Sequence, residues 1–468
     1  MIAEHKIKML QGFLGKLPGP IAGRLAKAIE VDRLGGGSVL PHDAILDSLR
    51  PILRNAQTSD RTLTPLRLLC RPFEDLLFST PRQNKLKGKI ARDSVMIVWN
   101  WIATDLLPDA AAAFEKNTTA AIMTGKMDEA ETEVLAFSAQ ISAAILSALE
   151  STDGVESAEA ALGDLSVVDD AREMAQLLGV AKDIRGLQEK LPKPFPTLSE
   201  DEIWVLREFY DSILATLPDA APYVAVITMN RLERPWEALR LPLQISRQTQ
   251  DTLISKTDMG LVGEILFAEM EENATAIHKA RPRHFDVDAL TTHVARFAEL
   301  STGLVKSVDI RRDGEWGQRL LKDRAAIAEI MDGFMERAPK EVLAAIPMQK
   351  TGRFSGGPSA PDLRHAPDPE KIVHALANAK LIMGCKPFAA ASSFGASLKD
   401  ARDQINQTLR SYSESLVGEL RGDKCERRSN AESYLDVAVE LTSLLTGAEE
   451  GELLRRRGRA ALAPRVAA

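Results

Sequence analysis

Cysteines, aromatic residues and long apolar runs are scarce in this chain of 468 residues. Its three cysteines, Cys70, Cys385 and Cys425, are odd in number and far apart, which excludes a regular disulfide framework. Sparse cysteine is typical of a reducing compartment, and residues 1–17 lack the apolar core of a secretory signal. We therefore expect a cytoplasmic protein.

The low aromatic content of 5% accompanies many Ala and Leu residues. Ala and Leu lose little free energy in a helix, whereas they fill the face of a sheet poorly. Apolar residues also recur at helical spacing through most of the chain. We predict an all-α fold of irregular multi-helix bundles, without the fixed repeat of a regular solenoid.

The longest run without a charged residue is Val134–Leu149, which makes it the candidate for a membrane span. As a helix it would be roughly 24 Å long, less than the roughly 30 Å of a bilayer core. Its many Ser and Ala residues suit close approach by a neighbouring helix. We predict a buried helix here and no transmembrane segment.

Proline and glycine indicate where the chain divides. The segment 348–370 is rich in Gly, Pro and Ser and has no periodic apolar stripe, so it reads as a linker. A Pro-rich connector at 190–200 precedes a helix that Ser199 is placed to cap. We predict two or three subdomains, and the predicted divisions are 1–190, 191–347, the linker 348–370 and 371–468.

The C-terminal part has the clearest helical stripes. One stripe repeats every 11 residues and consists of Leu398, Ala401, Ile405, Leu409, Tyr412, Leu416 and Leu420. A second stripe, on a helix that Asn430 or Ser429 would cap, consists of Tyr434, Val437, Leu441 and Leu444. Two such helices should pack as an antiparallel hairpin, followed by a basic tail.

Charge is distributed unevenly along a chain whose net charge is −7. Residues 1–100 hold 16 basic against 9 acidic residues, and residues 101–200 hold 7 against 18. An external anionic partner is one explanation. We favour the alternative that the two regions pair within the fold, because neighbouring parts of one chain meet at high effective concentration.

The stretch 82–101 combines cations with two tryptophans. Its candidate partner-binding residues are Arg82, Lys85, Lys87, Lys89, Arg92, Trp99 and Trp101. Arg and Trp dominate protein-binding hot spots, so we predict that this stretch binds another protein. Because the tryptophans are two positions apart on one helix, we expect one in the core and one facing outward. Nucleic acid is the weaker alternative, since the whole chain is acidic.

A second cluster, His278, His284, Asp286 and His293, contains residue types that ligate transition metals. Its spacing is unfavourable, because Pro282 interrupts it and no ligand pair is separated by four residues. Asp286 and Asp288 instead lie where a helix start needs caps. Capping is the favoured interpretation, and a metal site the weaker one.

The N-terminal stretch offers a third possible function. Its apolar positions Ile7, Leu10, Phe13, Leu14 and Leu17 lie among lysines, a pattern typical of helices that bind anionic membrane surfaces. Docking of the apolar face on the rest of the protein is the favoured alternative.

No motif for nucleophilic catalysis or cofactor binding occurs: G-x-S-x-G is absent, and no cysteine has a nearby histidine. We therefore predict an adaptor or scaffold that binds another protein, without a cofactor and without enzymatic activity. A helical enzyme, with metal assistance, and a peripheral membrane protein remain the alternatives.

Overall fold

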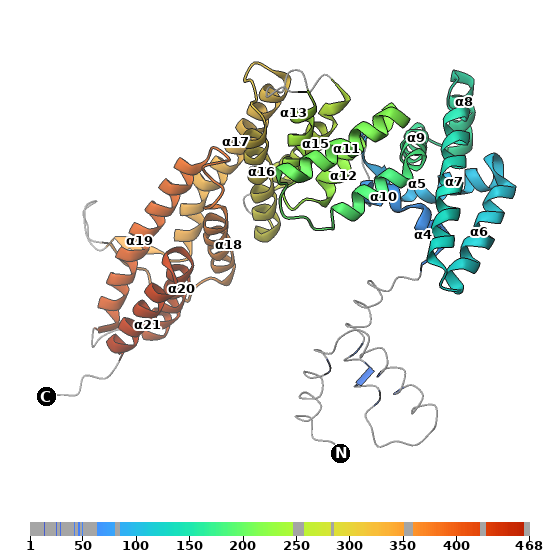
Figure 1. The fold of residues 1–468 in the computed structure, drawn as a ribbon. Helices are drawn as coiled ribbons and strands as arrows, with labels where there is room; N and C mark the ends of the chain where they lie inside the picture. Colours follow the sequence, from blue (N-terminus) through green and yellow to red (C-terminus); the bar gives the residue numbers. More distant parts are fainter. Residues whose placement is uncertain are drawn as a thin grey trace. The chain divides into compact units, whose positions relative to one another are not determined.

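The computed structural model describes residues 63–79, 85–246, 257–281, 285–350, 359–421 and 427–462, and seven residues of the first 62. Helix accounts for 80% of the structure and strand for 3%, which confirms the predicted all-α fold. Figure 1 shows the helices coloured along the chain, from blue near the N-terminus to red near the C-terminus.

The described α-helices begin with α4 (Pro65–Leu69), α5 (Arg92–Trp101), α6 (Pro108–Met123), α7 (Met127–Ala148), α8 (Thr152–Leu162), α9 (Leu165–Gly179), α10 (Ala181–Lys190), α11 (Glu200–Thr216), α12 (Tyr223–Arg231) and α13 (Arg240–Ser246). They continue with α15 (Leu261–Lys279), α16 (Val287–Ser307), α17 (Glu315–Ala344), α18 (Pro369–Cys385), α19 (Gly395–Arg421), α20 (Arg428–Thr446) and α21 (Ala448–Leu462). Shorter helical turns are η1 (Arg71–Leu76), η2 (Ile102–Leu106), η3 (Pro218–Ala220), η4 (Pro235–Leu239) and η5 (Asp258–Gly260). Two small sheets pair β1 (Leu77–Phe78) with β2 (Ile90–Ala91) in parallel and β3 (Met348–Lys350) with β4 (Ser359–Pro361) in antiparallel register.

The chain forms two compact units, of which the first comprises residues 1–71 and 108–137 and the second residues 72–107 and 138–468. This division follows contacts rather than sequence order. The predicted divisions at 190 and at 348–370 stay predictions. The predicted linker contains β3 and β4, so part of it is paired rather than extended chain.

The first unit has two local cores. Phe114 of α6 stacks on Phe137 of α7, with ring centroids 4.6 Å apart. Within residues 1–62, a buried cluster consists of Leu14, Ile29, Ile45 and Leu49. Of the apolar positions considered for membrane binding, Leu14 is the only one described, and it is buried within the protein.

In the N-terminal part of the second unit, the other elements pack around α9. Most of its side chains are buried, and it contacts α5, α8, α10 and β2. The predicted buried helix is α7, whose Ile141 and Ile145 are fully buried. Among the described residues, no single helix is long and apolar enough to cross a membrane. Only the pair α7 and α8, bent by 115°, passes that test together.

The predicted cap at Ser199 is confirmed. The Ser199 hydroxyl accepts from the Glu202 backbone N–H and the Glu202 carboxylate accepts from the Ser199 N–H, a capping box at the start of α11. The cap predicted at Ser429 or Asn430 is wrong. The helix α20 already begins at Arg428, after Arg427, and no side chain caps it.

The first predicted C-terminal stripe is correct. The second is correct except at Leu444, which is only partly buried, whereas Leu445 is buried. Every residue of the first stripe is buried on α19, and on α20 Tyr434, Val437 and Leu441 are buried. The two helices pack together as a hairpin, as predicted. The difference lies in the expected basic tail, most of which forms α21 and packs on both α19 and α20. Figure 1 shows these three helices side by side.

Candidate functional site

The basic stretch predicted to bind a partner holds a buried ion cluster. The Lys85 ammonium lies 2.6 Å from the nearer oxygen of Asp170 and 3.1 Å from an oxygen of Glu173, both on α9. It also donates to the backbone carbonyl of Lys89 at 2.7 Å. The Lys85 ammonium is therefore paired with two carboxylates and one backbone carbonyl inside the protein.

The carboxylates of this cluster also fix the loop that carries Lys85. Asp170 accepts hydrogen bonds from the Ser94 hydroxyl at 2.6 Å and from the Ala91 N–H. Glu173 accepts from the N–H of Gly88, whose positive φ of 79° suits a residue without a side chain. The loop and α9 are thereby held together by charge and by backbone hydrogen bonds.

One ammonium cannot balance two buried carboxylates. Burial raises the pKa of Glu173 to about 7, despite the opposing attraction of Lys85. With Glu173 protonated, Lys85 and Asp170 form a neutral pair. The cluster therefore changes its net charge close to neutral pH.

The remaining cations of the stretch have varied surroundings. Lys87 is half exposed and pairs with Asp258 at 2.9 Å, and Lys89 donates to the side-chain oxygen of Asn230. Arg92 is exposed and donates to the Ser79 hydroxyl. Arg82 lies outside the described residues.

Trp99 and Trp101 are both buried, with 8% and 7% of their surface exposed. This differs from the expectation that one of them faces outward. The helix α5 is covered by α8, α9 and β2, so more than one of its faces is internal.

The stretch 82–101 pairs the basic and acidic regions of the chain through the contacts of Lys85 with Asp170 and Glu173, as favoured from the sequence. Its partner-binding role stays a prediction.

The candidate metal ligands do not form a cluster where they are described. Asp286 caps α16 by accepting from the N–H groups of Asp288 and Ala289, which confirms the favoured interpretation. His293 contacts the Asn273 side-chain oxygen at 2.9 Å, and His284 lies outside the described residues. Among the residues that are described, no group of three or more His, Cys, Asp or Glu side chains could hold a metal ion.

A hollow among the described residues runs along α16. Two adjoining cavities of about 650 and 580 Å³ share Ala295, Glu299 and Phe388, so they form one groove. Its floor is the face of α16 that carries Thr291, Ala295, Ala298 and Thr302. These residues recur every three or four positions, so they lie on one face of the helix. Because they are small, a second helix could approach closely.

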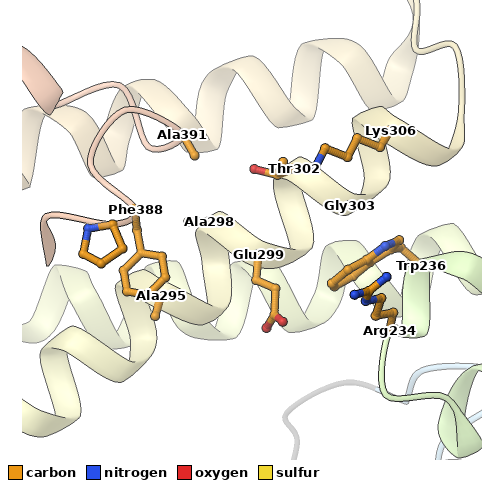
Figure 2. Close-up of a pocket in the computed structure, with 11 residues that line it drawn as sticks. Arg234, Trp236, Ala295, Ala298, Glu299, Thr302, Gly303, Lys306, Phe388 and Ala391 are labelled. Carbon is orange, nitrogen blue, oxygen red and sulfur yellow. The ribbon is translucent and has the colours of Figure 1, made fainter. Parts of the chain in front are cut away.

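Aromatic residues form the two walls of this groove, which we call the α16 groove. Figure 2 shows Trp236 and Arg234 on one side and Phe388 on the other, with Glu299 between them. Trp236 is held against α16 because Gly303 has no side chain: a Cβ there would lie 2.1 Å from the indole ring. Phe388 belongs to the turn after α18.

The rim of the α16 groove carries more positive than negative charge. Its cations are Arg234, Arg296, Lys306 and Lys380, and its anions are Asp288 and Glu299. Arg296 is engaged by Glu269 at 2.7 Å and by Glu299 at 3.0 Å. Lys306 and Lys380 are exposed and have no ion-pair partner among the described residues. The groove therefore presents unpaired cations beside an apolar floor.

Sequence reasoning did not find this groove, because its parts come from distant segments. Trp236, the α16 face and Phe388 lie in three different elements, and none of them belongs to a recognisable motif. The one local signal was the stripe of small residues on α16, which is equally typical of helix packing in a core.

Comparison with known proteins adds no assignment to this geometry. No protein-family model, no curated protein and no solved structure matches the chain.

Proposed function

We propose that this protein is a helical scaffold that binds an acidic, amphipathic helix of a partner protein in the α16 groove. The observation that supports the proposal is the combination of a small-residue floor, two aromatic walls and unpaired lysines at the rim. Recognition of a helix in a groove uses such an apolar floor for residues at i, i+3, i+4 and i+7 of the partner.

The dimensions of α16 suit such a partner. A helix of 21 residues is about 30 Å long, and the lining residues extend from Val287 to Lys306. Trp236 and Phe388 supply large contact areas that need little ordering on binding. Lys306 and Lys380 would attract carboxylates on the flanks of the bound helix. This attraction would orient the partner helix and raise its association rate.

The proposal keeps the predicted adaptor role, but it assigns partner binding to the α16 groove instead of to residues 82–101. The expected cytoplasmic location belongs to the same proposal, and its support is the sparse, scattered cysteine.

A pair of synthetic peptides tests the charge of the partner. Each would be about 18 residues long, with leucines at helical spacing and either glutamates or lysines on the flanks. Fluorescence polarisation with the full chain should show saturable binding of the acidic peptide, weakened by salt, and none of the basic one. Equal binding of the two peptides, or preference for the basic one, would overturn the proposal.

Matched variants test the place of binding. Lys306→Glu combined with Lys380→Glu should weaken binding of the acidic peptide at least tenfold, because the rim then repels it. The control is Lys182→Glu, an exposed cation on α10 that does not line the groove. If the rim variant and the control bind the acidic peptide equally, the groove is not its site.

A further inference from the structure

The helix α11 presents an exposed tryptophan on the surface of the second unit. Its apolar residues Ile203, Leu206 and Ile213 are buried, and the helix packs on α10, α12 and α13. On the outward side, Trp204 is 55% exposed and Leu214 is 41% exposed. Tryptophan is among the side chains that contribute most to protein–protein contacts, so this face is a candidate binding surface.

Acidic residues surround Trp204 on the outward face of α11. Asp201, Glu208 and Asp211 are exposed and lie three, four and seven positions from Trp204, which places all four residues on one side of the helix. Arg207 is the only basic residue of α11. Its Nε atom lies 3.7 Å from Asp211, and its guanidinium carbon lies 5.8 Å from the centroid of the Trp204 ring. The face therefore combines an aromatic ring and one cation with a surround of carboxylates.

The α16 groove has the opposite arrangement of charge. Lys306 and Lys380 are exposed at its rim. In its middle, Arg296 is shared between Glu269 at 2.7 Å and Glu299 at 3.0 Å. One guanidinium cannot balance two carboxylates, so the half-exposed Glu299 remains available to a further cation. The groove thus has cations at the rim and a negative charge between its aromatic walls.

We propose that α11 of a second copy of this chain binds in the α16 groove, an inference that rests on the proposed function. Trp204 of one copy packs between Trp236 and Phe388 of the other, which Figure 2 shows on opposite sides of the groove. Arg207 pairs with Glu299, and the carboxylates of α11 face the lysines of the rim. The two surfaces are therefore complementary in shape, in apolar contact and in charge.

A single chain cannot make this contact with itself. Both surfaces belong to the second unit, where α11 is held by its packing and its outward face is exposed while the groove is open. The lengths agree, because the 17 residues of α11 span about 25 Å and the 21 residues of α16 about 30 Å. Reciprocal exchange of the helices gives a closed dimer, and one-way contact gives a longer assembly. In either case the groove is filled until a partner helix displaces α11.

Sedimentation velocity of the full chain, from about 1 to 100 μM, tests for the assembly. The mass should rise above that of one chain with concentration, and an excess of the acidic peptide should return it to that of one chain. A monomer at every concentration, or an assembly that the peptide does not dissociate, would overturn the inference. Binding of the acidic peptide by such a monomer would leave the proposed function standing.

Charge reversal places the contact. Lys306→Glu with Lys380→Glu, and separately Glu208→Lys with Asp211→Lys, should each weaken self-association at least tenfold. An equal mixture of the two variants should assemble again, because each reversed surface then meets a complementary one.

The matched control is Glu156→Lys with Glu159→Lys, two exposed carboxylates on α8, which should assemble as the wild type does. Failure of the mixture to assemble would overturn the inference. Self-association that neither reversal weakens beyond the control would show that the chain assembles through another surface.

Discussion

The Lys85 ammonium and the Asp170 carboxylate lie 2.6 Å apart, with side chains that are 15% and 3% exposed. This pair joins the basic N-terminal region of the sequence to the acidic region that follows it. A cation that appears available to a partner in the sequence is thereby used to hold the fold together.

Lys85→Met should therefore destabilise the protein by about 3–5 kcal/mol, because it leaves Asp170 and Glu173 buried without a counter-charge. Urea denaturation measures this loss. The matched variant is Lys87→Met, two residues along the chain. Its ion pair with Asp258 is largely exposed and should be worth less than about 1 kcal/mol. Similar losses in the two variants would contradict a buried cluster.

The raised pKa of Glu173 makes stability depend on pH. Its pKa is about 7 in the folded protein against 4.5 for the unperturbed group. Between these values the folded state holds the proton that the unfolded chain releases. This contribution to the free energy of unfolding is fully present below pH 4.5 and is lost as pH rises to 7. The loss is of the order of 3 kcal/mol.

Glu173→Gln should remove this dependence, because the amide resembles the protonated carboxyl and does not titrate. The free energy of unfolding of both proteins would be measured by urea denaturation at several pH values across this window. The curve of the variant should be flatter than that of the wild type. Parallel curves would show that Glu173 titrates at its ordinary pKa.

Gly303→Ala tests the wall of the α16 groove. The added Cβ would lie 2.1 Å from the ring of Trp236, so the ring must move. We expect a loss of about 1–3 kcal/mol in the free energy of unfolding, and a shift in Trp fluorescence. The control is Gly333→Ala on α17, where a Cβ meets nothing within 4 Å, and which should gain up to about 1 kcal/mol. A neutral Gly303→Ala would contradict this packing.

Ser199→Ala tests the capping box of α11. Loss of the hydroxyl leaves the Glu202 N–H without its acceptor and should cost about 1 kcal/mol. Ser433→Ala is the comparison, because the Ser433 hydroxyl only bonds to a carbonyl within α20 and is exposed. That change should be neutral or slightly stabilising in thermal unfolding. Equal effects of the two substitutions would mean that the cap contributes nothing.

The sequence was sufficient where structure depends on local pattern. The stripe on α19 and the caps at Ser199 and Asp286 follow from spacing within one helix. It was insufficient where burial depends on distant elements. Whether Trp101 faces outward depends on which helices cover α5, and a helical period carries no information about that.

The same reason explains the candidate sites. The α16 groove combines residues from three elements, and α21 was not expected to be a helix at all. Its arginines suggested a tail, whereas Leu454 and the small residues Gly451 and Gly458 allow it to pack closely.

The most direct test of the proposed function is photo-crosslinking from the acidic peptide. A benzophenone group would replace one leucine on its apolar face, and mass spectrometry of the digested adduct would locate the attachment. We predict attachment within residues 234–236, 287–306 or 380–391, which contain the lining of the α16 groove, and competition by the unlabelled acidic peptide. Attachment elsewhere on the chain, with the same competition, would contradict the account.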